Sequence, residues 1–205
     1  MQPTNITERL RSETAILHQQ LEDLPISRSI LKPDVQVDEY GAYLATMYGI
    51  MKSVETNVFP VLKNVLPDIE KREKAHLLTR DLQAINYSFN PSEWSAGEAE
   101  IHFLHIQDLE SEQIAYALGV LYVVEGSTLG GRFILKNIRE ALQFDASNGA
   151  AYFAGYAEET GPMWKSFLHV LQQYAAEHGQ EDKIIQGANE AFQAFYNTFS
   201  TTAHA

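Results

Sequence analysis

The 205-residue sequence contains no cysteine. This absence excludes disulfide bonds, thiolate metal ligands and cysteine nucleophiles, and it permits a reducing compartment without proving one. Basic residues are also scarce: 15 lysines and arginines stand against 27 aspartates and glutamates, so the formal net charge is −12. Such a balance argues against a nucleic-acid binder, whose surface must neutralise phosphates, and against binding to an anionic membrane.

Long hydrophobic runs are missing as well. The first residues carry no apolar segment of the length that a signal peptide needs, and no later run approaches a membrane span. The hydrophobic content of 45% is that of an ordinary globular protein, and the length favours one domain over residues 1–205. We find no internal repeat and no composition shift that would mark a linker. We therefore expect a single acidic domain in the cytoplasm.

Apolar residues recur at helical spacing through most of the chain. One helix is expected from the Asn5 cap to Leu24, where Pro25 should end it. Residues 86–97 should form a loop, residues 101–106 fit a helix or a strand, and residues 145–161 interrupt the pattern. The other expected helices span residues 38–58, 67–85, 111–142, 160–179 and 184–199. The prediction is an all-α, single-domain, multi-helix fold.

The segment 116–138 has the apolar content of a buried helix, yet it contains four glycines: Gly119, Gly126, Gly130 and Gly131. Each glycine inside a helix costs about 1 kcal/mol relative to alanine. Two explanations stay open. The glycines mark a helix break or a close helix–helix contact that only glycine permits, or they form a kinked helix whose backbone lies against a ligand.

His18 borders the apolar stripe of the first expected helix. A single histidine there is commonly a core residue with a hydrogen-bond partner. An imidazole can also ligate heme iron from one side and leave the opposite face open to a gas.

Two segments together resemble the heme oxygenase family. LRSETAILHQQLE, which contains His18 and Glu22, resembles the proximal helix of that family. YVVEGSTLGGRFILKNI resembles the distal helix, with its Gly-x-x-x-Gly-Gly pattern at Gly126, Gly130 and Gly131. The Tyr-Val-x-Glu-Gly-Ser segment is closest to the bacterial branch that is often found beside phytochromes. The resemblance covers most of the chain.

This resemblance implies a specific reaction. Heme (haem) would be both cofactor and substrate, and would be converted with O₂ and electrons to biliverdin, CO and ferrous iron. His18 would be the proximal iron ligand, and Glu22 would help to orient the site. Gly126, Gly130 and Gly131 would form the distal backbone, between a proximal and a kinked distal helix. Glycine would be required because a Cβ would occupy the space needed for ordered water.

Several other residues acquire expected roles from the same resemblance. Ser127 stands where many members carry an aspartate, so a hydroxyl would have to hold the distal water. Arg11 and Lys165 would bind the heme propionates, and Tyr122 would line the pocket. Lys136 and Arg132 fit a solvated face better. The implied partners are an electron donor such as a ferredoxin or a flavin reductase, and a bacterial phytochrome that accepts the product.

Three alternatives are considered. A non-heme di-iron oxygenase needs carboxylates and histidines on facing helices. Glu73 and His76 have the Glu-x-x-His spacing but lie in the charge-rich EKREKAH run, which indicates a solvated face. His102 and His105 are spaced i, i+3 and could pair on a metal, but the surrounding loop favours surface histidines. A non-catalytic heme or bilin carrier is kept open by Ser127. Thiamin-degrading enzymes of similar architecture need a nucleophilic cysteine, which is absent.

Overall fold

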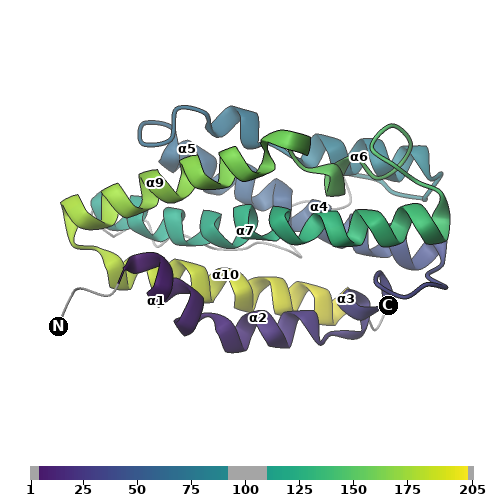
Figure 1. The fold of residues 1–205 in the computed structure, drawn as a ribbon, viewed down its shortest axis with the longest axis horizontal. Coiled ribbons are helices and arrows are strands. Elements are labelled where there is room, and N and C mark those ends of the chain that lie inside the picture. The colour runs from purple at the N-terminus through teal and green to yellow at the C-terminus, as the bar shows by residue number, and fades with distance from the viewer. Residues whose placement is uncertain (1–4, 92–109, 203–205) are drawn as a thin grey trace.

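The computed structural model describes residues 5–91 and 110–202, and every regular element within these ranges is a helix (Figure 1). The all-α prediction is confirmed for the described residues. The α-helices are α1 (Ile6–Glu13), α2 (Ala15–Glu22), α3 (Pro25–Ser29), α4 (Val37–Asn57), α5 (Phe59–Leu62), α6 (Ala75–Ala84), α7 (Glu110–Leu142), α8 (Ala151–Ala154), α9 (Thr160–His178) and α10 (Glu181–Thr202). Two 3₁₀ helices, η1 (Ile69–Arg72) and η2 (Ala157–Glu159), complete the order.

The first expected helix is divided in two. α1 ends at Glu13 and α2 starts at Ala15, while the Thr14 hydroxyl donates a hydrogen bond to the Leu10 carbonyl at 2.7 Å. A threonine that bonds back along the helix in this way commonly accompanies a bend. Pro25 also acts differently from the prediction, because it begins α3 and does not end α2. The first position of a helix tolerates proline because its amide needs no intrahelical partner there.

The single helix expected over residues 67–85 is also wrong. Glu73 is extended, with φ −63° and ψ 132°, and separates η1 from α6. The Glu55 carboxylate then accepts hydrogen bonds from the backbone amides of Lys74 and Ala75, at 2.6 and 2.8 Å. A side chain from α4 therefore satisfies the free amides at the start of α6. The segment expected at residues 101–106 lies outside the described residues.

α7 lies at the centre of the molecule, between α9 and α10 (Figure 1). A Cβ added to Gly119 would overlap the Ile184 carbonyl of α10, and one added to Gly187 would overlap the Tyr116 carbonyl of α7. The two helix backbones therefore touch at this crossing. α10 also packs against α2 and α1, so it joins the N-terminal helices to the central one.

The apolar character of α7 corrects one expectation from the sequence. By length and composition the helix could cross a membrane, with a window of mean hydropathy 1.3. However, 61% of that window is buried inside the protein. The packing of α7 against α9 and α10 explains its apolar residues, as in the core helix of a soluble protein.

The remaining boundaries follow the sequence closely. α7 continues through Gly126, Gly130 and Gly131 without interruption, so the glycines do not break the helix. The kink expected at these glycines stays a prediction. α9 ends at Gly179, which has the left-handed conformation (φ 64°) typical of a glycine cap.

Candidate functional site

One face of α7 carries most of the glycines, and the neighbours of this face differ from one part of the helix to another. At a rotation of about 100° per residue, its members fall within an arc of about 100°. They are Gly119, Tyr122, Gly126, Leu129, Gly130, Phe133 and Asn137. At one end Gly119 contacts α10. At the other end the Asn137 amide donates to the carbonyls of Ile30 and Lys32, at 2.8 and 2.9 Å.

Between these two contacts the face is open. Among the described residues, a Cβ added to Gly130 would meet no atom within 4 Å, and one added to Gly126 would meet only the tip of Trp164 at 3.8 Å. The neighbouring side chains of Leu129 and Phe133 are 37% and 63% exposed. An apolar, side-chain-poor surface of this kind is suited to a flat apolar ligand.

The four glycines therefore have different explanations. Gly119 fits the helix–helix contact, because α10 leaves no room for a Cβ. Gly131 has a packing reason too, since its Cβ would lie 3.2 Å from the Phe153 carbonyl of α8. For Gly126 and Gly130 no neighbouring helix within residues 5–91 and 110–202 explains the lack of a side chain, which favours the ligand explanation.

His18 does not fit the description of a satisfied core residue. Its side chain is 55% exposed on α2, and its Nε2 lies 3.6 Å from a carboxylate oxygen of Glu22, one turn later. The imidazole meets the ring of Phe192 of α10 edge-on, with the ring centres 5.5 Å apart. This distance to Glu22 is longer than a hydrogen bond, so within the described residues the exposed imidazole has a nitrogen available to bind a metal.

α10 relates His18 to the open face. Ile184 of α10 lies at Gly119, while Phe199 contacts Tyr43, which in turn contacts Phe153 beside Gly131. α10 thus follows α7 from Gly119 to the level of Gly131. Phe192 is midway along this path, so the imidazole that it supports lies near the level of Gly126.

Two of the expected basic and aromatic residues come together beside this face. The Arg11 charge acts on the phenol of Tyr122, whose pKa is raised by burial and lowered in part by that charge. The Tyr122 ring contacts Trp164 of α9, with 5.5 Å between the ring centres. Lys165 follows Trp164 and is exposed. Among the residues that the structure describes, neither Arg11 nor Lys165 forms an ion pair with a carboxylate.

Ser127 lies beside the open face and not on it. Its hydroxyl donates to the Val124 carbonyl at 2.7 Å and lies near the phenol of Tyr152 of α8, whose pKa it lowers in part. Burial raises the pKa of Tyr152, so this phenol keeps its proton at ordinary pH. The pair can hold water through its hydroxyls without adding a charge.

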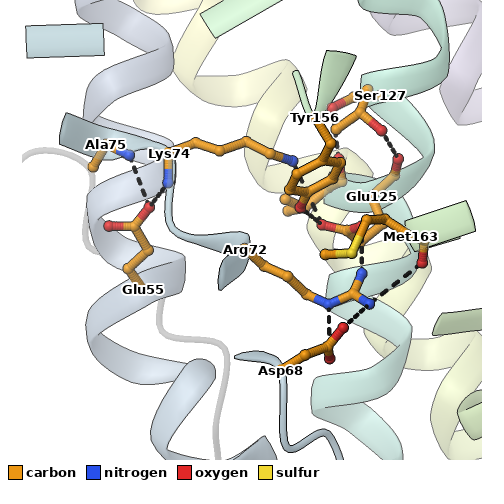
Figure 2. Close-up of polar contacts among 11 residues, drawn as sticks. Glu55, Asp68, Arg72, Lys74, Ala75, Glu125, Ser127, Tyr156 and Met163 are labelled. Atoms are coloured by element: carbon orange, nitrogen blue, oxygen red, sulfur yellow. Dashed lines mark hydrogen bonds and ion pairs between the residues drawn. The ribbon is translucent and has the colours of Figure 1, made fainter. Parts of the chain in front are cut away.

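A buried ionic cluster around Glu125 was not predicted from the sequence (Figure 2). The Glu125 carboxylate accepts from Arg72 and from the Tyr156 hydroxyl, both at 2.6 Å, and lies 3.5 Å from Lys74 Nζ. The EKREKAH run was interpreted as a solvated face, and this is wrong for Arg72 and Lys74, whose side chains are 0% and 2% exposed. A glutamate inside an otherwise apolar predicted helix was the signal that could have revealed the cluster.

The described residues offer little to a di-iron centre. No group of three or more histidine, aspartate or glutamate side chains within residues 5–91 and 110–202 could hold a metal ion. Glu73 is extended and His76 belongs to α6, so they do not share a helical turn. His102 and His105 lie outside the described residues.

Comparisons with known proteins identify similar chains. A family model described as heme oxygenase matches residues 4–201. The heme oxygenase PigA of Pseudomonas aeruginosa is 27% identical over 210 residues, which cover 98% of this chain and 96% of that protein. A heme oxygenase from Nostoc is 24% identical, and the matched region covers 92% of this chain and 82% of that protein.

Solved structures agree in fold. The NO- and CO-bound heme oxygenase of Neisseria meningitidis superposes with a TM-score of 0.75 at 25% identity, covering 97% of this chain and 92% of that one. The heme oxygenase of Leptospira interrogans gives a TM-score of 0.79 at 20% identity, with 97% and 100% covered.

Proposed function

Because this chain belongs to the heme oxygenase family, we propose that it binds heme between α2 and α7 and cleaves it to biliverdin, CO and ferrous iron. Heme degradation to biliverdin is the function of the family. The proposed position of heme rests on the open face of α7. On this face Gly126 and Gly130 lack side chains, and no neighbouring helix among the described residues requires glycine there.

The residues beside this face suit heme. His18 offers an imidazole nitrogen, which is a common iron ligand, and Leu129 and Phe133 offer exposed apolar surface for a porphyrin ring. When bound, heme supplies the iron that activates O₂, with electrons from an external reductant. The chain's own residues then have to bind heme, orient it and manage water above it.

His18 would ligate the iron, and the Glu22 carboxylate one turn later would orient its imidazole. Gly126 and Gly130 would let the α7 backbone approach the porphyrin, and Gly131 lets α7 approach α8. Ser127 and the Tyr152 phenol hold distal water. This pair is neutral, whereas the aspartate that many relatives carry in place of Ser127 is charged.

Arg11 and Lys165 bind the two heme propionates, and Tyr122 lines the pocket beside them. The lack of a described carboxylate partner at either cation supports this role, since each can pair with an incoming carboxylate. The rest of the proposal is a single domain over residues 1–205 in the cytoplasm, a ferredoxin or flavin reductase as electron donor, and a phytochrome as product acceptor.

A hemin titration of the wild type and His18→Ala tests the assignment. We expect a Soret band with wild-type protein that His18→Ala shifts or abolishes, because the variant would lack the imidazole that is proposed to bind the iron. His76→Ala is the matched control, since His76 is an exposed histidine on α6. Equal Soret bands in all three proteins would contradict the role of His18.

A non-catalytic heme or bilin carrier is the second candidate, and Ser127 in place of an acidic residue favours it. Single turnover with ascorbate or a reductase separates the two functions. Release of CO and a green pigment supports the enzyme. A stable heme complex that gives neither product supports the carrier.

A further inference from the structure

Two segments that are distant from α7 in the sequence converge on Glu125, the residue before Gly126 (Figure 2). Arg72 comes from the end of η1, Lys74 from the turn before α6, and Tyr156 from the turn between α8 and η2. All three bind the carboxylate of Glu125. On the helical wheel, Glu125 and Ser127 flank the open face of α7 on opposite sides.

The three charged side chains at the centre of the cluster are buried. The side chains of Arg72, Lys74 and Glu125 are 0%, 2% and 1% exposed. Arg72 is further bound by the Asp68 carboxylate at 2.8 Å and by the Met163 carbonyl at 3.3 Å. Well-packed apolar side chains commonly stabilise a fold as well as such a buried ion cluster, or better. A gain in stability is therefore weak ground for such a cluster.

The geometry gives the cluster a different use. Arg72 binds one oxygen of Glu125, while Tyr156 and Lys74 bind the other. Lys74 Nζ also lies 4.4 Å from the centre of the Tyr156 ring. Because the contacts come from separate segments, rotation or sliding of α7 would break at least one of them. The position of α7 is thus defined at the residue that precedes Gly126.

We propose that Glu125 is a positioning residue: through Arg72, Lys74 and Tyr156 it sets the height and rotation of the Gly126–Gly130 backbone above the bound porphyrin. This inference rests on the proposed function for its ligand. It goes beyond that function because it assigns a role to four residues that do not touch the ligand.

Glu125→Gln is the first test, because the amide keeps the size of the side chain and removes its charge. Glu190→Gln is the matched control: Glu190 also accepts a hydrogen bond from a tyrosine of α7, Tyr116, near the crossing with α10. In heme-free protein, amide hydrogen exchange over residues 126–131 should be about tenfold faster in Glu125→Gln than in wild type. It should be unchanged there in Glu190→Gln.

The second readout is spectroscopic and does not depend on turnover. The ferric heme complex of each protein is titrated with alkali, and the pKa of its visible spectral transition is recorded. A shifted distal backbone changes the hydrogen bonding of distal water, so this pKa should move by about half a unit or more in Glu125→Gln. An unchanged pKa would overturn the proposal even if exchange were faster.

A triple variant separates positioning from stability. Arg72→Met, Lys74→Met and Glu125→Leu together remove all three charges and leave no unpaired ion among them. We expect a folded protein with near wild-type resistance to urea but a displaced spectral pKa. Wild-type values of both exchange and spectral pKa would overturn the proposal. If the triple variant does not fold, Glu125→Gln decides alone.

The two readouts also distinguish this proposal from the proposed function. Exchange is measured without heme, so it tests the restraint on α7 whatever the protein binds. A wild-type protein that fails to bind hemin would contradict the proposed function. Equal exchange over residues 126–131 in Glu125→Gln and Glu190→Gln would contradict the positioning role.

Discussion

Gly130 and Gly119 lie on the same face of α7 and serve opposite purposes. Alanine at Gly130 would add a methyl group that meets no atom of the described part of the chain within 4 Å, whereas alanine at Gly119 would overlap the Ile184 carbonyl. A single residue type thus keeps space open at one position and lets two backbones touch at the other.

This contrast predicts opposite effects on stability. Gly130→Ala should stabilise the heme-free protein by about 1 kcal/mol, because alanine favours the helix, and should impair heme turnover by filling the open space. Gly119→Ala should destabilise it by about 1–3 kcal/mol through overpacking. Urea unfolding and single-turnover assays measure the two effects. Gly130→Ala protein that is less stable but fully active would contradict the interpretation of the open face.

The elements show why helix boundaries depart from the sequence pattern. The charge-rich segment 67–85 has helical spacing, but the helix restarts at Ala75 because Glu55 of α4 supplies an acceptor to the Lys74 and Ala75 amides. Such a cap comes from a residue 19 positions earlier than Lys74, so local periodicity does not contain it.

The α6 cap predicts a pH dependence. Burial raises the pKa of Glu55 above its ordinary value of 4.5. The folded protein then binds the proton more tightly than the unfolded chain, so this contribution to stability is full below pH 4.5 and is lost as pH rises through the folded pKa. Glu55→Gln should abolish it. Urea unfolding of both proteins from about pH 4 to about pH 7 gives the difference in unfolding free energy, and a difference that grows with pH would contradict the prediction.

At the scale of the whole molecule, the net charge of −12 affects how fast the electron donor associates with the protein. An acidic donor such as a ferredoxin meets long-range repulsion unless a local patch of basic residues offsets it.

We therefore expect association with an acidic donor to become faster as salt increases. Raising ionic strength from about 0.01 M to about 0.15 M shortens the screening length from about 30 Å to about 8 Å and weakens the repulsion. Stopped-flow reduction of the heme complex measures this rate. Association that slows with salt would mean that the basic residues prevail, and an insensitive rate would contradict steering by charge altogether.

The sequence by itself determined the helical composition, the candidate ligand His18 and the glycine segment of α7. These features are local: spacing, propensity and motif all act within a few turns. Only the tertiary structure decided which glycines face open space and which face another helix, since Gly126 and Gly119 have the same chemistry. It also decided that the side chains of Arg72 and Lys74 are buried against Glu125, because this partner lies more than 50 residues away in the sequence. Packing between distant segments determines the surroundings and the burial of each of these residues. The local sequence pattern does not contain that information.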